Sequence, residues 1–212
     1  MFYFTILFLL FNLIWAQYDI SSEYNKFVGW YEKYQNEKFN GINFNKYITS
    51  ESAIELVNNI HNQISNNQTH IFIVLDTDGG DLVQTYNIIN WMDLTRLNAN
   101  IKFHCVCIKA YSSGFFIFQL CDYRYWILNQ SHMMTHEPKI NIEGTFDFVS
   151  AYVNYVFSKD YHNYKTILDR IYLKTNLNQI SYINKISIQD WIINSSLEAK
   201  IYNLADFYID LI

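Results

Sequence analysis

Proline is almost absent from this chain of 212 residues: Pro138 is the only one, and it lies two residues after His136. Glycine is also scarce, with six in the chain, and two of these are adjacent at Gly79 and Gly80. No stretch has the composition of a linker and no segment repeats, so the chain is expected to form one domain rather than several joined units.

Runs of basic residues are also absent, and the formal net charge is −5. Such a chain lacks the basic surface by which proteins bind nucleic acid, so we expect no nucleic-acid partner. Cysteine is scarce as well: Cys105, Cys107 and Cys121 are too few for a disulfide framework. They are expected to be small buried side chains, and we expect neither a metal ion nor a cofactor.

Charge is missing from residues 1–16, which are nearly all apolar. This length is typical of a signal-peptide core and short for a membrane-spanning helix, although no lysine or arginine precedes it. A secretory signal peptide is the first interpretation, and an uncleaved membrane anchor or a buried segment of the fold are the alternatives. If the leader acts, the protein enters the secretory pathway or contacts a membrane; otherwise it is cytoplasmic or organellar. An N-terminal extension is expected over residues 17–40 and the main domain over residues 41–212.

Hydrophobic residues make up half of the chain, enough for a substantial core. Their pattern alternates between strands and helices. Strands are expected over residues 41–47, 71–75, 103–108 and 125–128, and helices over residues 50–64, 83–97, 113–120, 144–177 and 195–204. The continuous apolar run 71–75 is typical of a parallel strand buried on both faces. The alternation predicts an α/β fold with parallel strands and right-handed crossover helices.

Three short segments, each following or ending an expected strand, supply the groups of an acyl-transfer site. Gly79 and Gly80 allow a turn whose amides face a ligand, Ser112 offers a hydroxyl, and His136, 24 positions later, offers a base. Each alone has a plainer interpretation: a tight turn, a helix cap and a structural histidine. Their order along the chain favours the catalytic interpretation.

From about residue 43 to the end, the chain resembles the proteolytic subunit of the Clp protease, of the ClpP/crotonase superfamily. Residues 75–80 (Leu-Asp-Thr-Asp-Gly-Gly) stand where that family has Ser-Pro-Gly-Gly, and residues 109–114 (Lys-Ala-Tyr-Ser-Ser-Gly) where it has Gln-Ala-Ala-Ser-Met-Gly. Residues 133–138 (Met-Met-Thr-His-Glu-Pro) resemble its Met-Ile-His-Gln-Pro. Residues 195–199 and 202–206 resemble its Ser-Ala-x-Glu-Ala and Tyr-Gly-Leu-x-Asp.

The resemblance implies a ClpP/crotonase-like fold and a serine-type endopeptidase. It assigns Ser112 as nucleophile, His136 as general base, and the amides of Gly80 and Ser113 as the oxyanion hole. It also implies polypeptide substrates, a homo-oligomeric ring (a heptamer or a tetradecamer), and an AAA+ unfoldase as a candidate partner. A helical arm between Ile142 and Leu177 is expected to contact a neighbouring subunit.

The resemblance identifies the third member of the catalytic triad, an aspartate in the family, less directly. An ungapped count places Ser187 where the family has its catalytic aspartate and Trp191 where it has a second one. Asp190 is the only acid nearby, and a small length change makes it the expected partner of the histidine.

Three departures from the family pattern surround the nucleophile. Asp78 replaces the proline beside the oxyanion turn, Tyr111 replaces a small residue, and Ile108 replaces a glycine. Asp78, Tyr111 and the uncertain third residue favour one alternative, a catalytically inactive structural or regulatory ring subunit, whereas the presence of Ser112 and His136 opposes it. The second alternative is a crotonase-type acyl-CoA enzyme. Such an enzyme needs no serine nucleophile, so the spacing of Ser112 and His136 disfavours it. A relative of signal-peptide peptidases would explain the leader, but those enzymes typically use a serine–lysine pair.

Overall fold

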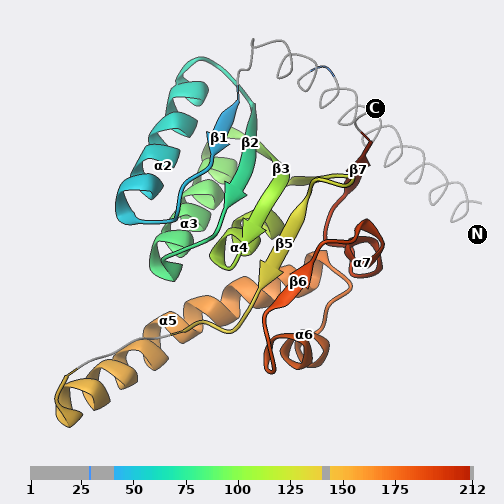
Figure 1. Ribbon diagram of the computed structural model, residues 1–212. Helices are drawn as coiled ribbons and strands as arrows, with labels where there is room; N and C mark the ends of the chain where they lie inside the picture. Colours follow the sequence, from blue (N-terminus) through green and yellow to red (C-terminus); the bar gives the residue numbers. More distant parts are fainter. Residues whose placement is uncertain (1–28, 30–40, 140–143, 211–212) are drawn as a thin grey trace, which may run out of the picture. The chain divides into compact units, whose positions relative to one another are not determined.

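A seven-stranded sheet organises the main part of the molecule (Figure 1). The structure is a computed structural model that describes Gly29, residues 41–139 and residues 144–210. The chain divides into two units, Met1–Gly41 and Ile42–Ile212, and the described strands all belong to the second. The leader predicted over residues 1–16 lies outside the described residues, as does the extension over residues 17–40 apart from Gly29.

Five parallel strands lie side by side in the order β1 (Ile42–Phe44), β2 (His70–Thr77), β3 (Lys102–Tyr111), β4 (Tyr123–Ile127) and β7 (Phe207–Ile209). A sixth strand, β5 (His132–Thr135), also pairs in parallel with β3, and β6 (Trp191–Ile193) pairs antiparallel with β5. β4 pairs with His104–Cys107 in the middle of β3, whereas β5 pairs with the last three residues of β3. The end of β3 therefore lies beside the strand that leads to His136 (Figure 1).

Helices connect the strands as crossovers, as the alternating pattern predicted. They are α2 (Ser50–Ser65), α3 (Leu82–Ala99), α4 (Ser113–Gln119), α5 (Phe146–Lys174), α6 (Gln179–Ile186) and α7 (Ser196–Ile201). α2 begins with a capping box in which the Thr49 hydroxyl accepts from the Ser52 amide and the Ser52 hydroxyl accepts from the Thr49 amide. None of the described helices is both long and apolar enough to cross a membrane.

The core lies between the sheet and the helices packed on it. All five residues of the apolar run 71–75 are buried, which confirms the prediction of a strand covered on both faces. Every residue of α4 is buried as well, so the helix that follows Ser112 is held firmly within the fold. The mixed α/β class with a parallel sheet is therefore confirmed, whereas α6 and the short strands β5, β6 and β7 were not expected.

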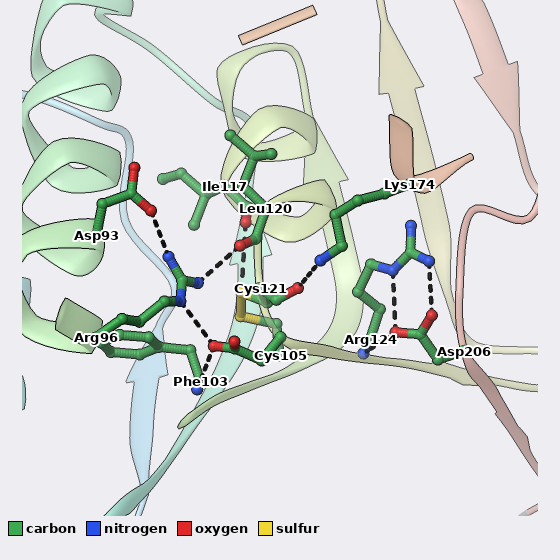
Figure 2. The surroundings of a disulfide bond; sticks show 11 residues. Asp93, Arg96, Phe103, Cys105, Ile117, Leu120, Cys121, Arg124, Lys174 and Asp206 are labelled. Carbon is green, nitrogen blue, oxygen red and sulfur yellow. Dashed lines mark hydrogen bonds and ion pairs between the residues drawn. A yellow bond between two sulfur atoms is a disulfide. The ribbon is translucent and has the colours of Figure 1, made fainter. Parts of the chain in front are cut away.

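All three cysteines are buried, as predicted, but two of them are paired with each other. Cys105 of β3 and Cys121, just after α4, form a disulfide with their Cα atoms 5.9 Å apart (Figure 2). The sequence alone could not show this pairing, because Cys105 and Cys121 come close together only when β4 aligns with β3, with Tyr123 paired with His104. Cys107 is free and buried, and burial raises the pKa of its thiol, so it is unreactive.

Candidate active site

Ser112 lies at a sharp turn between β3 and α4, and its backbone is strained. It has φ 51° and ψ −121°. Among the described residues, the other non-glycine residues with positive φ are all asparagines, which tolerate the left-handed region: Asn67, Asn100, Asn129 and Asn203. Serine has no such tolerance, and strain of this kind, of about 1–3 kcal/mol, persists where the surrounding structure enforces it, often at functional sites.

The Ser112 hydroxyl does not act as a helix cap. Ser112 occupies the cap position of α4, yet its side chain makes no capping hydrogen bond, and the residue is half-buried. The neighbouring hydroxyl of Ser113 is instead committed to the fold, donating to the Gly80 carbonyl at 3.1 Å. The plainer interpretation of the serine pair as a helix cap therefore does not describe Ser112.

The turn at Gly79 and Gly80 touches the Ser112 turn. Both glycines have positive φ, 90° and 145°. A Cβ atom at Gly79 would lie 2.7 Å from the Cβ of Ser112 and 3.0 Å from the Ser113 nitrogen. A Cβ atom at Gly80 would collide with the backbone of Ile48, whose amide donates to the Gly79 carbonyl at 2.7 Å. Only glycine fits at either position.

Two backbone amides at this contact remain available to a ligand. Within the described part of the chain, neither the Gly80 N–H nor the Ser113 N–H donates a hydrogen bond, whereas the amides on either side of Gly80 are paired. The Gly79 N–H donates to the Thr77 hydroxyl at 3.0 Å, and the Asp81 N–H donates to the Ile48 carbonyl at 2.9 Å. Unpaired amides on two touching segments are what an oxyanion hole requires.

His136 follows directly after β5, beside the Ser112 turn. The Ser112 N–H donates to the Met134 carbonyl at 2.7 Å, so the pairing of β3 with β5 continues into the turn. His136 is half-buried, and its Nδ1 lies 2.6 Å from the Glu137 carbonyl oxygen. Among the described residues, no hydrogen bond links the imidazole to the Ser112 hydroxyl. The topology therefore brings the two predicted residues to the same edge of the sheet without joining them.

Asp190 lies just before β6. The antiparallel register of β5 and β6 ends with the pair Thr135–Trp191, and His136 and Asp190 are the next residues beyond this pair on the two segments. The Asp190 carboxylate is nevertheless 46% exposed and lies 3.9 Å from the Lys139 ammonium, and among the described residues it makes no hydrogen bond to the imidazole. Its catalytic role stays a prediction.

The positions at which the family carries its aspartates have structural roles here. Ser187 ends α6, and Trp191 is buried with its indole N–H donating to Glu198 at 2.9 Å. Neither residue can supply a carboxylate to His136.

Lys109, which the sequence analysis did not single out, lies beside the Gly79–Gly80 turn. The register of β2 and β3 skips Ile108, so this bulge brings Lys109 opposite Asp76. The Lys109 ammonium lies 3.1 Å from Asp78 and 3.8 Å from Asp76. Its hydrogen bond to Asp78 raises the pKa of Lys109. The signal in the sequence would have been this cross-strand register, which no local motif shows.

Within the described ranges, no group of three or more His, Cys, Asp or Glu side chains could hold a metal ion.

The chain matches a known family. A family model described as Clp protease matches residues 27–210, which includes the sheet and all three segments of the candidate site. The match begins at Phe27, within the segment expected as an N-terminal extension. No curated protein is significantly similar to the chain.

Proposed function

The chain belongs to the Clp protease family, and we propose that it hydrolyses peptide bonds in polypeptides with Ser112 as the nucleophile. The family match supports both a ClpP-like fold and a serine-protease function. The strained Ser112 turn carries this proposal. The Ser112 hydroxyl makes no helix-capping hydrogen bond. The Ser112 turn also touches the Gly79–Gly80 turn, in which the Gly80 amide is unpaired among the described residues. A merely structural serine at a helix start would not need this backbone.

The proposed reaction has two stages. The Ser112 oxygen attacks the peptide carbonyl carbon while His136 takes its proton, and the Gly80 and Ser113 amides stabilise the oxygen that becomes negative. His136 then gives the proton to the departing amine, which leaves an acyl group on Ser112. Water, deprotonated by the same imidazole, hydrolyses this ester and restores the hydroxyl. The Ser112 hydroxyl and the imidazole must move into contact when substrate binds, as often happens in sites without substrate.

We also propose that the protein assembles as a homo-oligomeric ring of seven or fourteen subunits, as the family typically does. α5 supports this because it is 29 residues long and its C-terminal part is packed into the core, with Ile167 and Ile171 buried. Tyr161 and Leu173 of the same helix are largely exposed, at 53% and 87%. Native mass spectrometry of the full chain should show multiples of seven subunits, whereas a monomer would contradict this part of the proposal. An AAA+ unfoldase and membrane contact through the leader stay predictions.

A fluorophosphonate probe tests the nucleophile directly, since it reacts with an activated serine hydroxyl. Wild type should be labelled, Ser112→Ala should lose at least 100-fold of the labelling rate, and Ser65→Ala, at the exposed end of α2, should be labelled like wild type. Labelling that persists in Ser112→Ala would reject this residue as the nucleophile.

An inactive ring subunit is the second candidate function. Among the described residues, the missing hydrogen bond between the imidazole and the Ser112 hydroxyl, together with the pairing of Asp190 with Lys139, is the observation that favours it. Assembly into a ring without labelling or peptide turnover would support this alternative. Turnover of acyl-CoA thioesters without serine labelling would instead indicate the crotonase-type reaction.

A further inference from the structure

We propose that the backbone carbonyl of Glu137, held in place by Pro138, fixes the orientation and tautomer of the His136 imidazole. In serine proteases a carboxylate performs this task. Glu137 and Pro138 would be positioning residues, and the inference rests on the proposed role of His136 as general base.

The contact itself determines the tautomer. Nδ1 of His136 lies 2.6 Å from the Glu137 carbonyl oxygen, which can only accept a hydrogen bond. Nδ1 therefore carries the proton, and in the neutral ring Nε2 is left with a free lone pair. This is the tautomer that a general base needs, because Nε2 must accept the proton of the serine hydroxyl.

The chain on both sides of His136 is restrained. On the C-terminal side, proline confines the residue before it to extended backbone, so Pro138 restricts the Glu137 carbonyl. On the N-terminal side, the buried Thr135 hydroxyl shares a hydrogen bond of 2.5 Å with the hydroxyl of Tyr182, which is fully buried. The only proline of the chain thus has a physical purpose beside the base.

The competing group, the Asp190 carboxylate, is engaged elsewhere. Asp190 adjoins Trp191, whose partner Thr135 precedes His136, but the carboxylate oxygen is 3.9 Å from the Lys139 ammonium and the side chain is 46% exposed. A carboxylate in contact with water and a lysine orients an imidazole less firmly than a hydrogen bond made within two adjacent residues.

Nitrogen-15 NMR of the imidazoles in the full chain tests the contact without requiring activity. The six histidines are distinguished by comparison with His136→Gln. In its neutral form, the His136 ring should show the Nδ1–H tautomer. Asp190→Asn should leave that signature unchanged, whereas Pro138→Ala should shift part of the population to Nε2–H. An Nε2–H tautomer in wild type, a change of tautomer in Asp190→Asn, or an unchanged tautomer in Pro138→Ala would overturn the proposal.

Kinetics supply a second readout. Removing a triad aspartate lowers kcat by about 10⁴-fold in a serine protease. We expect Asp190→Asn to lose less than about 100-fold in kcat/KM, far less than a triad aspartate would cost, while the control Asp169→Asn on the exposed side of α5 stays within about threefold of wild type. Pro138→Ala should lower kcat about tenfold at nearly unchanged KM, because it disturbs the base and not substrate binding. A loss of 100-fold or more in Asp190→Asn would contradict the inference. Absence of turnover in wild type would instead reject the proposed function, and the tautomer measurement would still decide the contact.

Discussion

Asp78 is the residue whose charge bears most directly on the proposed oxyanion hole, since it stands next to the glycine turn. An isolated carboxylate there would oppose the negative charge that develops on the substrate oxygen. The structure places the Lys109 ammonium 3.1 Å from Asp78, and this hydrogen bond raises the pKa of Lys109, so the amine stays charged near neutral pH. The pair explains how an aspartate can occupy the position where the family has proline.

Removing Lys109 should therefore weaken catalysis through Asp78. We expect Lys109→Gln to lower kcat about three- to tenfold, an effect in the range of exposed ion pairs, and added salt should reduce the difference. Asp78→Asn in the same protein should restore most of the loss. The control Lys102→Gln disturbs a similar pair with Asp122 at the opposite end of β3 and should leave kcat unchanged. Peptide turnover at two salt concentrations measures this, and a double variant as slow as Lys109→Gln would contradict it.

Among the elements, β3 and α4 form the unit that carries the nucleophile, and the Cys105–Cys121 disulfide closes it. The crosslinked cysteines are 16 positions apart and enclose Ser112, Ser113 and all of α4. Two further side chains hold the chain around the disulfide (Figure 2). Arg96 donates to the Leu120 carbonyl and forms an ion pair with Asp122, and Lys174 donates to the Cys121 carbonyl. Such a bond persists in an oxidising compartment, in keeping with the secretory interpretation of the leader.

Loss of this disulfide should destabilise the domain. For a loop of this length the stabilisation is about 3 kcal/mol, so the paired variant Cys105→Ala with Cys121→Ala should melt about 6–12 °C below wild type. Cys107→Ala, which removes a buried free thiol, should show only a smaller packing loss. Thermal unfolding compares the three proteins. Thiol titration of unfolded, unreduced wild type should find one thiol, and three thiols would show that the bond does not form.

For the whole molecule, the stability of the domain should depend on pH through Lys174 at the end of α5. Burial, aided by the nearby Arg124, lowers the pKa of Lys174 from 10.5 to about 8. Between these two values the unfolded chain binds more protons than the folded one, so the free energy of unfolding should rise as the pH rises through this window. Below about pH 8 the cost of the buried charge is fully present.

A comparison of wild type with Lys174→Met measures this dependence. Between pH 7 and pH 9.5, wild type should gain about 1–2 kcal/mol more stability than the variant, since each pKa unit corresponds to 1.36 kcal/mol. Urea unfolding at both pH values gives the difference. Parallel changes in the two proteins would show that Lys174 does not titrate in this range.

Local patterns were enough to predict the main elements of the fold. The apolar run 71–75 became β2, the hydroxyl cap at Thr49 began α2, and the helical spacing after Gly144 became α5. The short strands β6 and β7, of three residues each, were not predicted, because a segment of that length has too few residues to show a hydrophobic period.

The sequence by itself determined the α/β fold, the family, and the three segments from which Gly80, Ser112 and His136 come, because apolar periodicity and short motifs are local properties of a chain. The tertiary structure alone decided how these groups meet. The division of β3 between β4 and β5 brings Ser112 beside His136, and strand register joins Cys105 to Cys121 and Lys109 to Asp78. Register arises from side-chain packing across strands and from bulges such as the one at Ile108, and neither is written in any single segment.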